Sequence, residues 1–261
     1  MLRRMSFVVG SLLLVLGLTV PVGAQGGNAR IRVIHASPDA PAVDVFVDGK
    51  AVLSNVGFPA ISSYLSVPAG THSLAVAPAG KGEGAAVIKA NPTLEAGKAY
   101  TVAAVGFVAN IKAEIYADNL SAPAPGKAHV RVIHASPDAP AVAVKVKGGP
   151  TLIQSLAFPN ASSYLPVAAG TYHLEVTPAG ANTVVIDLPN TELKAGTIYD
   201  VVAVGKLSDI RVKVATFTPA MSGDMTSPLP ATGAGDSQNI GLVILGLLLA
   251  FAGLGMRRRM A

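Results

Sequence analysis

Apolar and polar side chains alternate along short runs of this chain. Valines occupy every second position of segment 43–47, opposite Asp44, Phe46 and Asp48. Segments 142–147 and 210–214 alternate in the same way, with Val142, Val144 and Val146, and with Ile210, Val212 and Val214. A period of two over a few residues indicates strands with one buried face. Turn signals such as Asp48-Gly49 and Pro68-Ala69-Gly70 separate the runs. Seven or so short strands in about 90 residues, without a helical period, predict a β-sandwich.

The chain also repeats itself. Segment 32–43 returns at 131–142 with the same twelve letters, RVIHASPDAPAV. Phe58-Pro59 returns as Phe158-Pro159, and Ser-Ser-Tyr-Leu occurs at both 62–65 and 162–165. A period near 99 residues is a whole domain and is too long for a solenoid unit. We therefore expect an all-β protein with two tandem β-sandwich domains, repeat 1 (residues 27–120) and repeat 2 (residues 127–218). A short, semi-rigid linker of residues 121–126 joins them.

Residues 1–24 have the order of a secretory signal peptide. Arg3 and Arg4 precede an apolar core at 7–20, and Val22-Gly23-Ala24 forms a small-residue cleavage site. We expect signal peptidase to cut between Ala24 and Gln25. The alternative is an uncleaved membrane helix, and the shortness of the apolar core argues against it.

A second targeting pattern is found near the other end of the chain. The pentapeptide Leu229-Pro230-Ala231-Thr232-Gly233 precedes an apolar run at 240–256, which three arginines follow at once. These three parts resemble the sorting signal of bacterial proteins that a sortase cuts between Thr and Gly and joins to the cell wall. The resemblance implies peptidoglycan as a partner and an extracellular location at the cell wall. It also implies a transmembrane segment (240–256) that holds the precursor in the membrane, and a basic cytoplasmic tail (257–261). The stretch 219–239, which contains the pentapeptide and is rich in Thr, Ser, Pro, Gly and Met, has little to bury, so we expect a flexible stalk there.

Three alternatives to this interpretation remain at the sequence level. The pentapeptide can match by chance, and the apolar run can be a permanent membrane anchor. A glycolipid-anchor signal also ends in an apolar tail, but the terminal arginines and the intact pentapeptide argue against it.

Removal of the targeting segments changes the charge of the chain. The formal net charge of the whole chain is +5, whereas residues 25–232 hold 15 basic and 14 acidic residues, a net charge of +1. Nucleic-acid binding needs a basic surface, so we expect no nucleic-acid partner. The chain has no cysteine, which excludes thiolate metal sites and a cysteine nucleophile and is compatible with an extracytoplasmic bacterial protein.

The repeated His-Ala-Ser-Pro-Asp-Ala-Pro motif offers His, Ser and Asp side chains. A hydrolytic relay needs the base between nucleophile and acid, which three side chains within five residues do not easily assemble. One His and one Asp fall short of a structural zinc shell. We therefore expect a structural motif, in which the imidazole points to the apolar face and Ser and Asp accept backbone N–H bonds in a turn. Its members are His35, Ser37, Pro38 and Asp39, and His134, Ser136, Pro137 and Asp138.

The same motif resembles the signature of a bacterial family of unknown function whose domains occur, often in tandem, in secreted and surface proteins. The resemblance covers nearly all of residues 29–218. It implies an immunoglobulin-like or transthyretin-like β-sandwich, and it brings no established activity, cofactor or catalytic residue.

Other side chains allow two interpretations each. Tyr64 and Tyr164 can stack on a sugar ring, or they can pack on the sandwich and use their hydroxyls to close a corner. The remaining histidines, His72, His129 and His173, are not shared by the two repeats and indicate surface or strand-edge positions. A calcium loop built on Asp39, Asp44 and Asp48 is not expected, because repeat 2 keeps only the first of the three. We expect no metal site.

Together these patterns predict a non-enzymatic surface protein with a structural or adhesive role. The alternatives are a polysaccharide-binding module that uses Tyr64 and Tyr164, a surface protein held permanently by its C-terminal helix, and a hydrolase. A glycan or a protein remains open as the ligand. Signal peptidase and sortase are the partners expected during processing.

Overall fold

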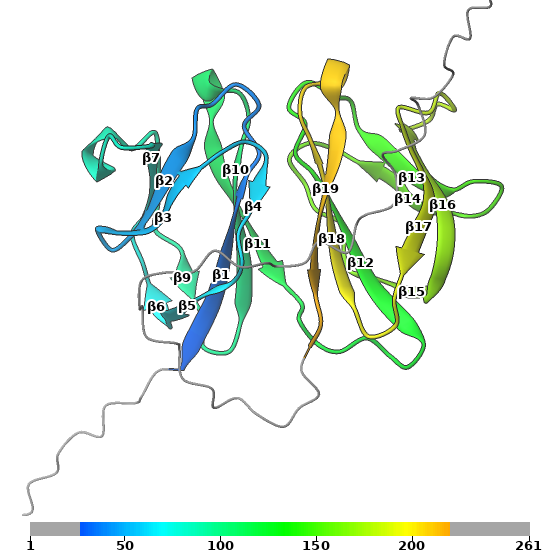
Figure 1. The fold of residues 1–261 in the computed structure, drawn as a ribbon, viewed down its shortest axis with the longest axis horizontal. Helices are drawn as coiled ribbons and strands as arrows, with labels where there is room; N and C mark the ends of the chain where they lie inside the picture. Colours follow the sequence, from blue (N-terminus) through cyan, green and yellow to red (C-terminus); the bar gives the residue numbers. More distant parts are fainter. Residues whose placement is uncertain (1–26, 220–261) are drawn as a thin grey trace, which may run out of the picture. The chain divides into compact units, whose positions relative to one another are not determined.

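A computed structural model describes residues 27–219. The proposed signal peptide, sorting pentapeptide and transmembrane segment lie outside the described residues. Within the described range, no helix is both long and apolar enough to cross a membrane. The chain is all-β as expected, with strands and short 3-10 turns (Figure 1).

Repeat 1 contains eleven short strands and two 3-10 turns. They are β1 (Asn28–His35), β2 (Val43–Val47), β3 (Lys50–Val56), β4 (Ala60–Ile61), β5 (Leu65–Pro68), β6 (Gly70–Thr71), β7 (Leu74–Pro78), η1 (Glu83–Ala85), β8 (Ile88–Ala90), β9 (Thr93–Leu94), β10 (Ala99–Val105), η2 (Val108–Asn110) and β11 (Lys112–Asp118).

Repeat 2 follows the same plan with fewer and longer strands. They are β12 (Lys127–His134), β13 (Val142–Val146), β14 (Thr151–Leu156), β15 (Leu165–Ala168), β16 (Gly170–Pro178), β17 (Ile186–Leu193), β18 (Ile198–Val204), η3 (Leu207–Asp209) and β19 (Arg211–Phe217). All these strands fall inside the two residue ranges expected for the repeats.

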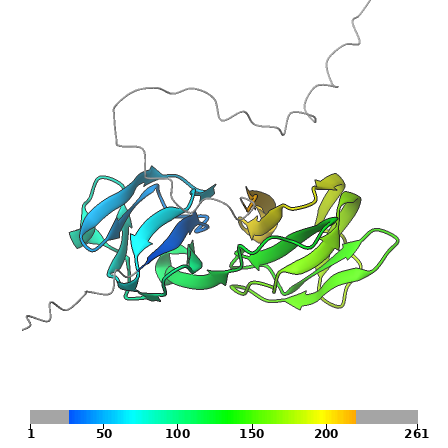
Figure 2. The same cartoon turned by 90° about the horizontal axis from the view of Figure 1, so that it is seen from below.

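Each repeat has two main sheets. In repeat 1 the order β11-β10-β1-β4, with β5 also paired to β1, makes one sheet, and β3-β2-β7-β8 makes the other; β6 and β9 form a small ribbon. Repeat 2 has β15-β12-β18-β19 and β14-β13-β16-β17. Figure 2 shows the same strands from below. Val33 and Ala104 of the first sheet pack against Val45 and Val76 of the second, so the core of repeat 1 lies between its sheets.

The first strand of each repeat runs parallel to the second-last long strand. β1 pairs with β10 from Arg30 opposite Ala99 to His35 opposite Ala104, and β12 pairs with β18 in the same way. Parallel strands are usually covered on both faces. Ile31 and Val33 lie in the sandwich core, whereas Ile34 and Ala36 lie in a separate buried cluster. These strands therefore have two buried faces.

The exposures of Phe46 and Val214 depart from the alternation expected from the sequence. Phe46 was expected on the polar face of β2, but it is only 8% exposed because it packs with Ala75, Ala77 and the partly buried Ala86. Val214 was expected on the buried face of β19, but it is 47% exposed. β19 is an edge strand of its sheet, so this side chain has a neighbouring strand on one side only.

Candidate functional site

The motif histidines are fully buried at the ends of β1 and β12. In each copy, the imidazole Nε2 lies 3.0 Å from a backbone carbonyl six residues later, Pro41 for His35 and Pro140 for His134. A carbonyl oxygen only accepts, so Nε2 carries the proton. Burial lowers the pKa of both histidines, and the carbonyl hydrogen bonds oppose that shift by less. Both imidazoles are therefore neutral structural donors at neutral pH, and both are 0% exposed.

The motif aspartates accept backbone N–H bonds, although not from their own turn. Asp39 Oδ1 accepts from the N–H of Val108 at 2.8 Å, and Asp138 Oδ1 accepts from Leu207 at the same distance. Val108 and Leu207 are the first residues of η2 and η3. An aspartate at this place satisfies a donor that a helical turn leaves free. Each motif therefore holds the connection between the last two strands of its repeat.

The motif serines donate where the sequence predicted that they accept. Ser136 Oγ donates to the carbonyl of Gly205 at 2.7 Å, just before η3. Ser37 Oγ donates to Asp39 Oδ1 at 3.4 Å. Pro38 and Asp39 form the expected turn, and Pro137 and Asp138 do the same in repeat 2. Most donors and acceptors of the motif are thus used inside the fold, and among the described residues His35 Nδ1 is a buried exception without a hydrogen-bond partner.

The aspartates considered for a calcium loop bind different parts of the backbone. Asp44 accepts from the N–H groups of Asn55 and Gly80, each at 2.8 Å. Asp48 accepts from Ser73 N–H at 2.9 Å and pairs with His72 Nδ1 at 2.7 Å. These hydrogen bonds lower the pKa of both carboxyls. Both aspartates therefore hold neighbouring segments of repeat 1 in place through hydrogen bonds.

Tyr64 and Tyr164 each cover a buried arginine. The guanidinium of Arg32 lies 4.9 Å from the ring centroid of Tyr64, and that of Arg131 lies 4.6 Å from the ring of Tyr164. Such contacts stabilise a cation that has lost its water. The Tyr64 hydroxyl donates to Asp118 at 2.7 Å, and burial followed by the Asp118 charge raises the pKa of Tyr64. The Tyr164 hydroxyl lies 3.4 Å from Asp200.

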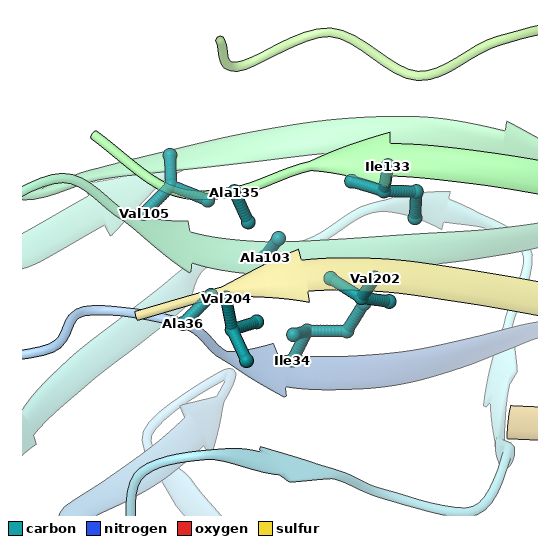
Figure 3. Packing of buried hydrophobic residues seen from close by; sticks show 8 residues of the cluster. All are labelled: Ile34, Ala36, Ala103, Val105, Ile133, Ala135, Val202 and Val204. Carbon is teal, nitrogen blue, oxygen red and sulfur yellow. The ribbon is translucent and has the colours of Figure 1, made fainter. Parts of the chain in front are cut away.

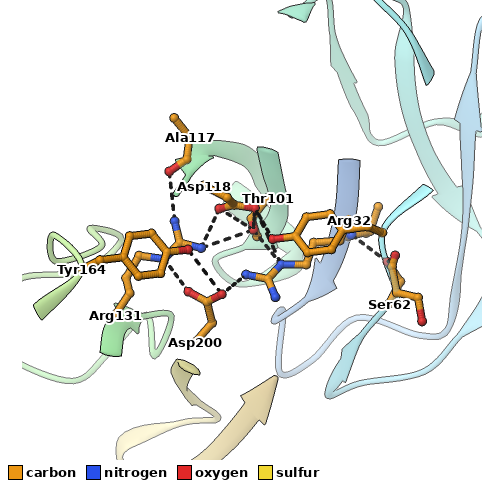
Figure 4. Close-up of polar contacts among 11 residues, drawn as sticks. Arg32, Ser62, Thr101, Ala117, Asp118, Arg131, Tyr164 and Asp200 are labelled. Atoms are coloured by element: carbon orange, nitrogen blue, oxygen red, sulfur yellow. Dashed lines mark hydrogen bonds and ion pairs between the residues drawn. The ribbon is translucent and has the colours of Figure 1, made fainter. Parts of the chain in front are cut away.

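Those two arginines belong to a buried charged cluster built by both repeats (Figure 4). Arg131 Nε donates to Asp200 at 2.6 Å, and Arg131 Nη2 donates to Asp118 at 2.6 Å. Arg32 also donates to Asp200, and its Nε donates to the hydroxyl of Thr101 at 2.8 Å. The Thr101 hydroxyl in turn lies 2.7 Å from Asp118 Oδ2. Each repeat thus bonds to a carboxylate of the other.

The charges of this cluster balance, which explains how they can be buried. Two arginines face two aspartates, and all four side chains are at most 3% exposed. Burial opposes the charge of Arg131, but Asp200 and Asp118 more than offset that effect and raise its pKa. Removal of one member would leave an uncompensated buried charge, which is strongly destabilising. The cluster therefore depends on both repeats being present.

An apolar cluster lies beside these charges and is also shared (Figure 3). Each repeat contributes the same four positions, spaced by 99 residues: Ile34, Ala36, Ala103 and Val105, and Ile133, Ala135, Val202 and Val204. All eight are at most 1% exposed. In symmetric dimers, the same surface patch of each subunit usually forms the contact with the other subunit. We call this combined surface, charged and apolar, the inter-repeat interface.

Further contacts extend the inter-repeat interface at its margin. The Tyr116 hydroxyl donates to the carbonyl of Pro159, and the guanidinium of Arg211 lies 5.7 Å from the ring centroid of Phe58. Lys206 Nζ lies 5.8 Å from the ring of Phe107, which links the loops before η3 and η2.

Sequence reasoning found the motif but missed the interface. Arg32 and Arg131 stand at the same place in the repeated strand, inside an otherwise apolar run, and that is the signal that could have identified them. Asp118 and Asp200 carried no such signal, because position 101 is Thr where position 200 is Asp, and position 217 is Phe where position 118 is Asp. The remaining sequence-predicted site residues, Ala24, Gln25 and the pentapeptide 229–233, lie outside the described residues.

Comparison with known proteins adds a family but no activity. The family model described as "Domain of unknown function (DUF4397)" matches residues 29–145 and 128–227. No curated protein sequence matches the chain. The Bacillus anthracis TIE protein is 11% identical with a TM-score of 0.23; the match covers 69% of this chain and 34% of that one. The carbohydrate-binding module CBMbc (family CBM26) from Eubacterium rectale Amy13K, solved with maltoheptaose, is 12% identical with a TM-score of 0.22, over 75% and 98% of the two chains. Scores this low support no inference about function.

Proposed function

The chain belongs to the DUF4397 family, and from that premise we propose that it is a non-enzymatic surface protein of the bacterial cell wall with a structural or adhesive role. In this proposal a sortase joins Thr232 to peptidoglycan, and the two repeats are displayed together beyond the stalk. The mature protein runs from Gln25 to Thr232.

The observation that carries the structural role is the inter-repeat interface. Its charged cluster and its apolar cluster each draw on both repeats. Relative motion of the repeats would expose four charges and eight apolar side chains, so the two act as one rigid unit. A rigid unit on a flexible stalk keeps its outermost loops in a fixed arrangement relative to one another while it is displayed beyond the wall. That property suits a spacer or an adhesin.

The sheet order favours the transthyretin-like form of the sandwich. In an immunoglobulin domain the first two strands share a sheet. Here β1 and β2 lie in different sheets, as do β12 and β13, and β1 is parallel to β10. We assign both repeats to the transthyretin-like form on this basis.

Polysaccharide binding through Tyr64 and Tyr164 has less support from the geometry. One face of each ring covers a guanidinium, and the Tyr64 ring also meets Phe217 edge-on at 5.9 Å. A glycan array with the 25–232 fragment separates the two roles. Binding that Tyr164→Ala abolishes, with an unchanged melting temperature, would favour the polysaccharide-binding module.

Anchoring is tested by mass spectrometry of wall fragments released by muramidase. The expected product ends at Thr232, with its carboxyl in an amide bond to a peptidoglycan amine. A Thr232→Ala variant serves as the control and should remain in the membrane fraction. Segment 240–256 found intact in the mature parent protein would remove the sortase proposal and favour a permanent anchor.

A further inference from the structure

Three potential metal ligands converge on the outer face of repeat 2. They are His173 and Glu175 of β16 and Asp187 of the neighbouring β17. One ligand atom from each residue lies within 4.8 Å of the other two. This group is separate from the motif, the tyrosines and the inter-repeat interface.

Strand geometry explains why the three side chains meet. Residues two apart on a strand share a face, so His173 and Glu175 point outward while Leu174 and Val176 fill the core. Glu175 lies directly opposite Asp187 in the β16–β17 ladder. Two carboxylates in that position repel each other unless a cation lies close by.

The present contacts leave the group available to a cation from solution. His173 Nε2 lies 2.5 Å from Asp187 Oδ1, and the only nearby ion pair of Glu175 among the described residues is with Lys147, at 3.5 Å. The Lys147 side chain is 56% exposed and that of Asp187 is 51% exposed. The lysine end of this pair is exposed although the Glu175 side chain is only 15% exposed, so Lys147 can return to water once another cation replaces it beside the carboxylate.

Repeat 1 provides an internal comparison. The positions that match His173, Glu175 and Asp187 hold Ser73, Ala75 and Lys89, and Ala75 lies opposite Lys89 in the β7–β8 ladder. On that face Ala75 is buried with Phe46 and Ala77. The same scaffold thus carries an apolar face in one repeat and a ligand set in the other.

We propose that His173, Glu175 and Asp187 bind Zn²⁺, with one coordination position left to water or to a partner's ligand. One imidazole and two carboxylates form a three-ligand set that borderline cations of this kind accept. The His173 and Asp187 side chains separate slightly as the ion enters between them, and Lys147 moves away from Glu175.

Isothermal titration calorimetry of the 25–232 fragment with ZnCl₂ tests this site. The fragment contains every strand of the described structure. One ion is expected per chain, and His173→Ala or Asp187→Asn is expected to weaken binding by at least about tenfold. Lys147→Met removes the cation that pairs with Glu175 and should tighten binding, while Lys145, opposite Glu175 in the β13–β16 ladder, stays in place. Because these side chains are partly exposed, the melting temperatures without zinc should stay close to that of the parent.

His72→Tyr is the matched control. His72 also pairs with an aspartate, Asp48, but only two ligands meet there. Tyr172 stands at the matching place in repeat 2, and both side chains bond to the carbonyl four residues earlier. This variant should bind Zn²⁺ like the parent. No heat from the parent, binding that survives His173→Ala, or binding that His72→Tyr abolishes would overturn the proposal.

Discussion

At the scale of single residues, the motif aspartate connects two distant parts of its repeat. Asp39 and Asp138 each bond to the first N–H of a 3-10 turn 69 residues further along the chain. A glycine precedes each turn, Gly106 or Gly205, with a positive φ of 93° or 98°, a conformation that glycine adopts without strain. Because the local structure is the same in both repeats, the effect of one substitution can be compared at Asp39 and at Asp138.

Asp39→Ala is expected to destabilise repeat 1 by about 1 kcal/mol, the usual effect of losing a side-chain cap at a helical turn. Asp138→Ala should have the same effect on repeat 2, because its bond to Leu207 has the same length. Thermal melting followed by circular dichroism measures both. A variant that melts like the parent yet loses ligand or metal binding would show that the motif is a binding site.

The buried motif histidines predict a loss of stability in acid. The pKa of His134 lies below its ordinary value of 6.5 in the folded protein, chiefly because of burial. The unfolded chain therefore binds a proton first as the pH falls below about 6.5, and stability declines from there down to the folded pKa. His134→Gln retains a side-chain donor for the Pro140 carbonyl without titrating.

Melting temperatures of the parent and His134→Gln should be compared between pH 7.5 and pH 5. The parent should lose stability more steeply on acidification than the variant. His72 has the opposite sign, because its bond to Asp48 raises its pKa and favours the folded state in acid. His72 titrates in both proteins. Only the difference between the pH profiles of the parent and of His134→Gln therefore reports on His134. Parallel pH profiles would contradict the role assigned to His134.

At the scale of strands and sheets, part of the fold followed from the sequence and part did not. The alternation of Val43, Val45 and Val47 predicted β2 correctly, since all three valines are buried. The second buried face of β1, with Ile34 and Ala36, was not predicted, because a period of two identifies only the face that meets the core of the same domain. The near-continuous apolar run of β1 is typical of a strand with two buried faces, but it does not say what covers the outer one.

The two sandwich cores also differ in how well they are filled. An apolar cavity of about 50 Å³ lies between the sheets of repeat 2, against about 10 Å³ in repeat 1. Ile31 lines the smaller cavity, and Val130, 99 residues later, lines the larger one. One missing methylene at this position accounts for part of the difference.

Val130→Ile should stabilise repeat 2 by about 0.5–1 kcal/mol, because it buries one more methylene in space that is already apolar. The reciprocal Ile31→Val should cost repeat 1 about 0.5–1.5 kcal/mol. Urea unfolding measures the midpoint for both variants. A lower midpoint for Val130→Ile would mean that the cavity is too narrow for the added atoms.

At the scale of the whole molecule, two sequence copies form one structural unit. The division into repeats 27–120 and 127–218 predicts that each half folds alone, and each half does hold its own pair of sheets. Because the inter-repeat interface is buried, each repeat on its own would expose its four apolar side chains and its arginine, Arg32 or Arg131. The halves should therefore fold with lower stability than the whole and bind each other.

The test is to mix fragments 27–120 and 127–218 and follow their mass by analytical ultracentrifugation. A 1:1 complex is expected, since each fragment brings one arginine and one aspartate to the charged cluster and the same four apolar positions to its neighbour.

Asp200→Ala in the second fragment should weaken the complex by about 3–5 kcal/mol, because it leaves the Arg32 and Arg131 charges short of a partner. Asp187→Asn, on the exposed outer face of repeat 2, is the control and should leave the affinity unchanged. Folded fragments that stay monomeric when mixed would show that the linker alone holds the repeats together, and fragments that stay unfolded would show that the repeats fold only as a pair.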